Sequence, residues 1–254
     1  LICAFLIDIT ICVYRFLFFV GKTTIQCPED YRTINSSETN TQCPENYGMT
    51  DSLRDLFLGK HNYLRCELAI GNVSNGQTGQ MCRKAAKLPA FMYCCDLEKT
   101  AYDRAKLCDQ FNSTSLEYLS ENSWTFVERV DRPSSEAAES AIENWWSELS
   151  KLQNGIEQIQ NLYYTHAGIN SFAKMASDLT TGVGCGVVRC GKSTNVVCHY
   201  QTSLTNGVRI YGMGPTCRRC QTGLDSCINN LCPAASDACP AATTETTTAA
   251  TLSQ

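Results

Sequence analysis

The chain contains 254 residues, of which 43% are hydrophobic and 18% are charged. This composition can support one hydrophobic core with appendages, and it leaves little for a second domain of similar size. The net charge is −4 and the lysines and arginines are scattered, so no basic stripe is available to neutralise phosphates and nucleic acid is excluded as an expected partner.

The chain begins with the apolar run LICAFLIDITICVYRFLFFV, which Gly21 and Lys22 follow. This pattern is typical of a secretory signal peptide, and an uncleaved membrane anchor is the alternative. Asp8 and Arg15 interrupt the run, whereas a membrane span needs about 20 uninterrupted apolar residues. We therefore interpret residues 1–26 as a signal peptide or N-terminal apolar segment, and we expect a secreted, extracellular protein with no stable membrane span.

Cysteine content points to the same compartment. The sequence has 17 cysteines, which is more than a reduced cytosolic protein usually carries, and it predicts disulfide bonds formed under oxidising conditions. Removal of Cys3 and Cys12 with a signal peptide leaves an odd number, so one thiol stays free or pairs with another chain. Glycosylation sequons at Asn35, Asn72 and Asn112 agree with an extracellular glycoprotein.

Residues 27–49 contain CPEDY and CPENYGM on either side of a polar stretch, and we predict a small arm held by Cys27 and Cys43. A helix is predicted next, over TDSLRDLFLGKHNYLRCELAIG, with Thr50 or Asp51 as N-cap. Its apolar stripe consists of Leu53, Phe57, Leu64 and Leu68. His61 lies three residues before Leu64, which places it on the inward face.

Three more helices are predicted further along the chain. One covers residues 96–108, with Leu97, Ala101, Ala105 and Cys108 on one face. Another begins at Pro133 and Ser134 and runs to residue 152, with Glu148 at the edge of its buried stripe. A shorter one carries Ile169, Phe172, Ala176 and Leu179 on one side. Between the first two, residues 119–129 favour a short extended segment.

The segments VGCGVVRC and TNVVCHYQT are separated by Gly191, Lys192 and Ser193, and they predict a β-hairpin. A turn at 191–194 places residue 187 opposite 198 and residue 185 opposite 200, and VRIY at 208–211 is a candidate third strand. Because helices precede strands instead of alternating with them, the pattern favours an α+β fold over a doubly wound sheet.

Beyond Tyr211 the composition changes. Residues 213–240 form a cysteine-rich, hinge-like module with few apolar side chains, so cross-links must hold its shape. The spacing Cys217-x2-Cys220-x6-Cys227-x4-Cys232 is compatible with a metal knuckle, but in a secreted chain it favours disulfides. Residues 241–254 are a Thr-rich tail that we expect to be disordered.

Eight short segments follow one another along the chain: CPENYGM, KHNYLR, MYCCDLEKTA, LSEN, WWSEL, TTGVGCGVV, NVVCHY and IYGMG. In this order they resemble the CAP superfamily of cysteine-rich secretory proteins, and especially the activation-associated secreted proteins of nematodes. The resemblance covers residues 43–232. It implies a three-layer α-β-α sandwich with an antiparallel sheet, and it places one CAP domain at residues 50–212.

The resemblance also implies a central cleft with two histidines and two glutamates. On the motifs quoted, His61, Glu121 and Glu148 match three of these positions. The fourth belongs to a Gly-His-(Phe/Tyr)-Thr-Gln-x-x-Trp motif, which here reads NSFAKMAS, so that Ser171 stands at the histidine and Lys174 at the glutamine. His166, five residues upstream, is an alternative that requires a gap.

Two kinds of chemistry follow for such a cleft. His61, Glu121 and Glu148 with water could form a weak divalent metal site, zinc for example, although no cofactor is expected to be required. The alternative is a hydrogen-bonded network that only holds the cleft together. A hydrolase with Ser171 as nucleophile and His61 as base is disfavoured, because the sequence shows neither a Gly-x-Ser-x-Gly elbow nor an oxyanion hole.

The resemblance implies disulfides as well. The predicted hairpin register separates Cys190 from Cys198 by about 10 Å, too far for a bond. The family-like pairing is Cys185 with Cys198, which leaves Cys190 for Cys108. Cys94 stands where the family pattern has no cysteine and is the first candidate for the odd thiol, with Cys66 and Cys82 as alternatives.

The resulting hypothesis is a secreted protein without enzymatic activity, similar to the excretory-secretory proteins of parasitic nematodes, that binds a host protein or cell-surface receptor. A carrier of lipid or sterol is the alternative, with Trp145, Trp146, Phe172 and Met175 as candidate pocket residues. A metal-dependent hydrolase is the third hypothesis.

Overall fold

Residues 26–29, 39–108 and 120–239 are described by a computed structural model of the chain. Its helices are α2 (Asp51–Ala69), α3 (Cys95–Ala105), α4 (Ser134–Trp146), α5 (Glu148–Lys151), α6 (Asn170–Ala176) and the 3-10 helices η3 (Thr165–Ala167) and η4 (Leu224–Ser226). Its strands are β1 (Ala85–Lys87), β2 (Met92–Tyr93), β3 (Glu121–Phe126), β4 (Thr180–Arg189), β5 (Thr194–Thr202) and β6 (Gly212–Met213). The predicted leader, the sequons at Asn35 and Asn112 and the Thr-rich tail lie essentially outside these residues.

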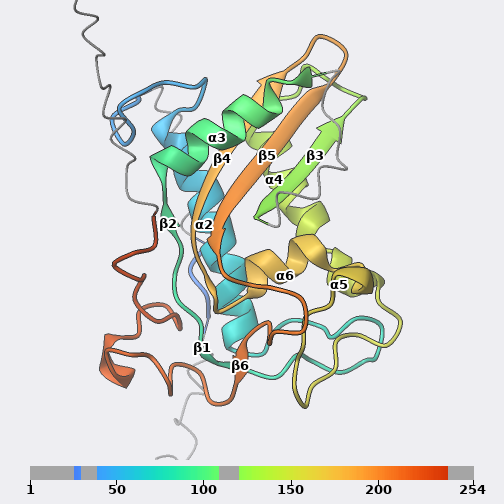
Figure 1. Cartoon of the computed structure of the whole chain (residues 1–254), viewed down its shortest axis with the longest axis vertical. Helices are drawn as coiled ribbons and strands as arrows, with labels where there is room; N and C mark the ends of the chain where they lie inside the picture. The colour runs from blue at the N-terminus through green and yellow to red at the C-terminus, as the bar shows by residue number, and fades with distance from the viewer. Residues whose placement is uncertain (1–25, 30–38, 109–119, 240–254) are drawn as a thin grey trace, which may run out of the picture.

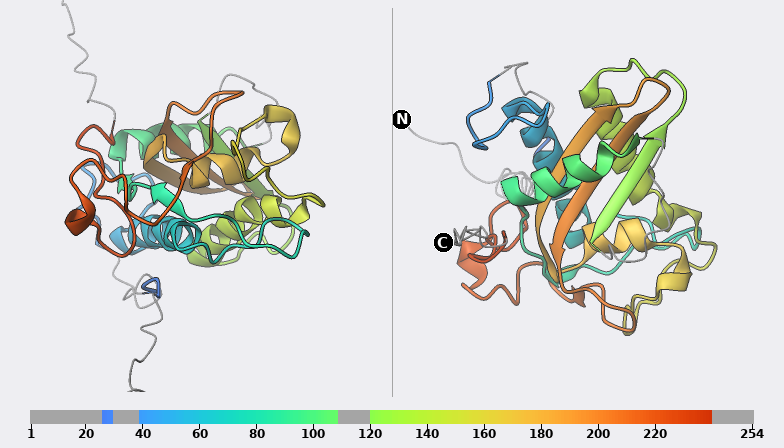
Figure 2. Two further views of the ribbon diagram at one scale, coloured as in Figure 1. Left: turned by 90° about the horizontal axis from the view of Figure 1, so that it is seen from below. Right: turned by 45° about the horizontal axis from the view of Figure 1, so that its top comes forward.

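A sheet in the order β2-β4-β5-β3 forms the middle layer of the molecule. Its β4–β5 and β5–β3 pairs are antiparallel, and β2 joins β4 in parallel. Helix α3 covers one face, whereas α2, α4 and α6 lie on the other (Figures 1 and 2). The predicted α+β fold with three α-β-α layers is therefore confirmed.

The hairpin differs from the sequence prediction in register. Cys185 pairs with Cys198 and Arg189 with Thr194, so the predicted pairing of residue 185 with 200 is wrong by two positions. The turn occupies residues 190–193, one residue earlier than predicted, because Cys190 N–H donates to Ser193 O at 2.7 Å and Gly191 adopts a positive φ of 72° there. The third strand is also not VRIY, in which Arg209 makes only an isolated bridge to Leu162. The partner of β5 is β3.

Alternation along β4 explains the motif TTGVGCG. Val183 and Cys185 face the core between the sheet and the α2–α4 layer, whereas Gly184 and Gly186 face α3. A Cβ atom on Gly184 would lie 2.2 Å from the backbone nitrogen of Glu98 in α3. The helix backbone therefore rests directly on the strand, and only glycine leaves room for it.

We predict that Gly184→Ala lowers the free energy of unfolding by about 3 kcal/mol or more, because backbone atoms on α3 cannot move aside as a flexible side chain could. Guanidinium denaturation with the disulfides intact measures this. Gly212→Ala is the matched control, since its Cβ would meet nothing nearer than the Asp178 carboxylate at 3.4 Å. Equal stability of the two variants would contradict this account of the motif.

The helices were largely predictable, with two differences at their ends. The third predicted helix is interrupted at Ser147, where α4 stops and the short α5 begins. The Ser147 hydroxyl donates to the Asn144 carbonyl at 2.8 Å and so competes with the helical backbone pattern. Helix α6 ends at Ala176, so Leu179 lies beyond it.

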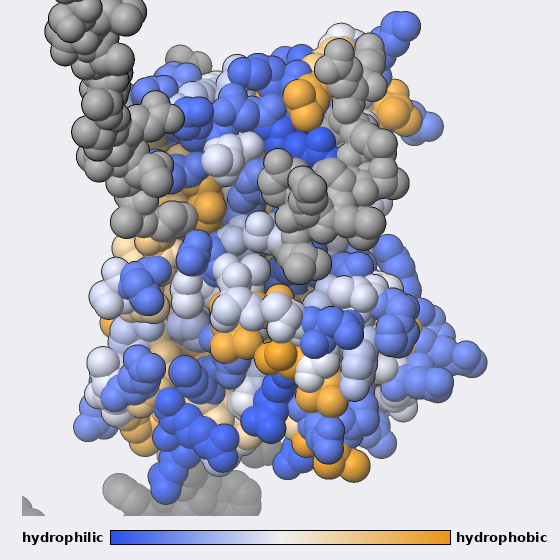
Figure 3. Space-filling view, viewed as in Figure 1, coloured by the Kyte–Doolittle hydropathy of each residue, from blue (hydrophilic) through white to orange (hydrophobic). Residues whose placement is uncertain are grey.

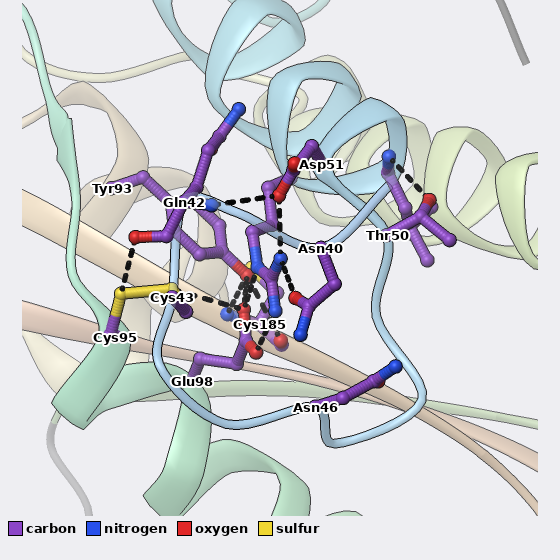
Figure 4. A network of polar contacts seen from close by, with 12 residues as sticks. Asn40, Gln42, Cys43, Asn46, Thr50, Asp51, Tyr93, Cys95, Glu98 and Cys185 are labelled. Atoms are coloured by element: carbon purple, nitrogen blue, oxygen red, sulfur yellow. Dashed lines mark hydrogen bonds and ion pairs between the residues drawn. A yellow bond between two sulfur atoms is a disulfide. The ribbon is translucent and has the colours of Figure 1, made fainter. Parts of the chain in front are cut away.

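A buried ion pair fixes the N-terminal arm and α3 to α2 (Figure 4). Arg54 donates from Nε and Nη2 to the two oxygens of Glu98, both at 2.7 Å, and both side chains are fully buried. Tyr93 donates its hydroxyl to the same carboxylate at 2.7 Å. Asp51 accepts the backbone N–H groups of residues 41 and 42 at 2.8 and 3.1 Å, which docks the arm onto the start of α2.

Seven disulfides staple the described residues: Cys27–Cys66, Cys43–Cys95, Cys94–Cys239, Cys108–Cys190, Cys185–Cys198, Cys217–Cys227 and Cys220–Cys232. The expectation that Cys94 is the odd thiol is wrong, because Cys94 forms a disulfide with Cys239. Cys82 is the free cysteine among the described residues. Burial raises the pKa of its thiol to about 11, so it stays protonated at neutral pH.

The C-terminal segment lies along the lower part of the molecule in Figure 1. Strand β6 pairs with β1, and the Cys232 carbonyl accepts a hydrogen bond from Ala90 N–H at 2.9 Å. The cysteine-rich residues are therefore joined to the main domain by backbone pairing as well as by Cys94–Cys239. Over the described residues, none of the helices combines the length and the apolar character that crossing a membrane requires.

Candidate functional site

Four separate elements supply the residues expected in the cleft. His61 comes from α2, Glu121 begins β3, Glu148 begins α5 and Ser171 lies in the first turn of α6. Among the described residues, His61, Glu121 and Glu148 do not lie close enough together to share an ion. Hydrogen bonds nevertheless link Ser171 directly to Glu148 and, through Asn122 and Tyr200, to His61.

His61 is fully buried. Its Nδ1 lies 2.7 Å from the Phe57 carbonyl, which can only accept, so Nδ1 carries the proton and Nε2 accepts the Tyr200 hydroxyl at 3.0 Å. Burial, with the charge of Arg65 in addition, lowers the pKa of His61 to about 4. Both ring nitrogens are occupied, so His61 is a core residue and is unsuited to bind metal or to serve as a base for Ser171.

Glu121 is bound by two cationic or polar partners. Arg104 Nε approaches its Oε2 at 3.1 Å and His199 Nε2 donates to the same oxygen at 3.1 Å. Burial acts to raise the pKa of this carboxyl, but the hydrogen bond from His199 and the charge of Arg104 outweigh it and hold the pKa below its usual range. Glu121 is therefore an ionised carboxylate whose charge is compensated by the protein.

His199 also contacts Thr100, whose hydroxyl lies 2.8 Å from Nδ1. The resulting order of hydroxyl, imidazole and carboxylate superficially matches a nucleophile, base and orienting acid. Thr100 lies inside α3, however, where its hydroxyl also bonds the Leu97 carbonyl and neighbouring N–H groups bond within the helix. Because Thr100 lies in the interior of α3 and its hydroxyl is shared with the helix, we interpret these contacts as joining α3 to β5 and β3.

Glu148 caps helix α6 from a different helix. Its Oε2 accepts the backbone N–H groups of Ser171 at 2.7 Å and Phe172 at 3.0 Å. Residue Ile169, at the N-cap position, offers no side-chain hydrogen bond, so the glutamate satisfies N–H groups that would otherwise lack partners. Ser171 thus meets Glu148 through its backbone and not through its hydroxyl.

Asn122 and Lys174 belong to the same hydrogen-bond network, although the sequence analysis assigned them no role. Asn122 donates to the Ser171 carbonyl and to the Tyr200 oxygen, both at 3.1 Å, and it accepts from Lys174 Nζ at 3.2 Å. A continuous chain of hydrogen bonds therefore runs from His61 through Tyr200 and Asn122 to Lys174. The sequence motifs already contained two members of this chain, because Asn122 follows Glu121 in SEN and Tyr200 follows His199 in CHY.

Lys174 is a buried cation, with only 7% of its surface exposed. Its Nζ donates to Asn122 Oδ1 and to the Asn170 carbonyl at 3.1 Å. Burial lowers the pKa of this amine to about 8, while the negative charges of Glu148 and Glu121 oppose the shift. At neutral pH the amine is still mostly charged, which adds a fixed positive charge to the cleft.

The expected metal ligands do not fit a divalent ion. His61 offers no free nitrogen, Glu148 is used by α6, and Glu121 is bonded to Arg104 and His199. His166 is exposed and lies against Tyr164, so it does not replace the missing histidine. In the described part of the chain, the residues close enough to share an ion are Cys217, Cys220 and Cys227, and all three belong to disulfides.

These features define a class: a disulfide-stapled α-β-α sandwich whose cleft carboxylates are bonded by donors of the protein itself. The family model of the cysteine-rich secretory proteins (CAP) matches residues 58–200, more than half of the chain. The chain belongs to this family.

Three relatives illustrate the similarity. The chain is 36% identical over 205 residues to Ancylostoma secreted protein of Ancylostoma caninum, covering 78% of this chain but only 48% of that relative. It is 28% identical over 176 residues to hookworm platelet inhibitor 1 of the same species, covering 68% and 75% of the two chains. The crystal structure of NaASP2 with Zn²⁺ superposes with a TM-score of 0.65 at 30% identity, covering 75% of this chain and 99% of that one.

The buried imidazole predicts a pH dependence of stability. The pKa of His61 is about 4 in the folded protein, against 6.5 for an ordinary histidine, so unfolding takes up a proton between these values. Stability from this residue is complete above pH 6.5 and is lost as the pH falls towards 4. The difference amounts to roughly 3 kcal/mol.

His61→Gln should remove this part of the acid sensitivity, because glutamine does not titrate and its side-chain oxygen can accept from Tyr200. Denaturant titrations of both proteins at pH 7, 5.5 and 4.5 measure it. The wild type should lose more stability than the variant as the pH falls, and parallel losses would show that His61 is not the titrating group.

Proposed function

We propose that this protein is secreted, has no enzymatic activity and acts by binding host proteins or host cells. The observation that carries the proposal is the state of the candidate site: His61, Glu121 and Glu148 are each hydrogen-bonded within the protein, and the contact of Glu148 with Ser171 is to its backbone N–H. A fixed network of this kind supports a scaffold more readily than proton transfer.

The relatives support the direction of this proposal. One is named a secreted protein and another a platelet inhibitor. Seven disulfides among the described residues suit an extracellular setting, and polar side chains dominate the face seen in Figure 3, over which apolar groups are scattered. Asn72 is exposed in the loop after α2, so its sequon is open to glycosylation in such a setting.

The direct test is binding of the fluorescently labelled, disulfide-bonded chain to washed mammalian platelets and endothelial cells, read by flow cytometry. We expect saturable binding that excess unlabelled protein displaces. Ser171→Ala should bind like the wild type, because the proposal gives its hydroxyl no role, whereas reduced and alkylated protein should not compete. Binding that rises linearly with concentration on every cell type would contradict the proposal.

A pocket beside α2 supports lipid binding as a second candidate function. Its volume is about 440 Å³, within the usual range of ligand sites, and Tyr63, Leu64, Trp146 and Leu149 contribute to its apolar lining. Lys60 and Glu143 form an ion pair at 2.8 Å on the same lining. Of the four residues named from the sequence, only Trp146 lines the pocket, while Trp145, Phe172 and Met175 are buried in the core.

For this second function we predict that Leu64→Gln weakens the uptake of a fluorescent fatty acid or sterol several-fold, because it places an amide in the apolar lining. Leu58→Gln is the matched control, since Leu58 lies on the same helix but lines a separate pocket of about 580 Å³. Mass spectrometry of lipids extracted from the purified protein gives an independent measurement. Absence of lipid together with absence of uptake would exclude the carrier function.

A further inference from the structure

Lys174 occupies the position at which the resembling motif carries glutamine, one helical turn beyond Ser171. Because residues three apart lie on the same face of a helix, the lysine and the serine that replaces histidine point to the same side of α6. The two departures from the motif are therefore neighbours in space, and they change the charge of the cleft together.

We propose that the Lys174 ammonium is the resident cation of this cleft and takes the role that a divalent metal ion would otherwise have. The ammonium is held by two oxygens, Asn122 Oδ1 at 3.2 Å and the Asn170 carbonyl at 3.1 Å. Both are neutral oxygen acceptors, so the ammonium is oriented by hydrogen bonds that do not neutralise its charge by direct contact.

Two carboxylates supply the balancing negative charge. Glu148 in α5 and Glu121 in β3 act on the ammonium through their negative charge rather than by direct contact, and the charge of each opposes the loss of its proton. These are the glutamates at the cleft positions, so the lysine is placed where their fields combine. The same ammonium charge would repel a divalent ion that came to either carboxylate, and more strongly where burial lowers the effective dielectric constant.

The second cleft cation is Arg104, which contacts Glu121 at 3.1 Å. Arg104 balances the charge of Glu121, and the N–H groups of α6 stabilise the charge of Glu148. Groups of the protein itself therefore already compensate both carboxylates. An ion would have to displace these partners, and the His61 nitrogens are both taken. The cleft therefore keeps its shape without metal.

The test compares Zn²⁺ binding by four full-length, disulfide-bonded proteins, using isothermal titration calorimetry at pH 7. These are the wild type, Ser171→His, Lys174→Gln and the double variant. We expect no saturable site in the wild type and at most weak binding to either single variant. The double variant should bind at least 10-fold more tightly than Ser171→His, and adding Glu148→Gln to it should abolish the gain.

Two results would overturn the proposal. One is a saturable Zn²⁺ site in the wild type that Glu148→Gln or Glu121→Gln removes. The other is equal affinity of Ser171→His and the double variant, which would mean that the ammonium does not oppose metal. Lys174→Met, of similar length and without charge, replaces Lys174→Gln if that variant does not fold.

Discussion

The guanidinium of Arg65 is buried, and the fold satisfies it with backbone carbonyls. Its nitrogens donate to Pro89 O at 2.7 and 3.0 Å, to Met175 O at 2.7 Å and to Ser177 O at 2.9 Å, and the group stacks on the Phe91 ring at 4.0 Å. Burial lowers the pKa of Arg65 to about 9, which leaves it charged at neutral pH. An unsatisfied buried charge is very costly, so α2, the segment between β1 and β2, and the end of α6 can only pack in positions that keep these carbonyls in place.

This constraint also decides what the cleft can do. Arg65 fixes α2 against α6, and His61 lies one turn earlier on α2, so its ring points into the core towards Tyr200. The carboxylate of Glu121 is bound by Arg104 and His199, and that of Glu148 by the N–H groups of α6. The polar residues of this network therefore act mainly on one another.

Much of the fold could be read from local patterns. Helical spacing identified α2, α3, α4 and α6, and the β-rich segments around Gly191 identified the hairpin, because these signals depend on residues a few positions apart. The predicted register of the hairpin was wrong because a shift of one residue in the turn changes the local energy little. The observed register is the one that places Cys185 opposite Cys198. Strands β1 and β2 are too short to give a periodic signal, and their partners lie far away in the sequence.

The sequence by itself determined the layered α+β fold, the disulfide-rich character and the family, because composition and ordered motifs carry that information. Only the tertiary structure decided which residues form the cleft network, that Cys94 pairs with Cys239 and that Cys82 is the free thiol among the described residues. Contacts between side chains that are far apart in the sequence produce no periodic pattern in that sequence. The partners of His61 and Lys174 lie on other elements, and their burial and charge exist only once those elements have packed.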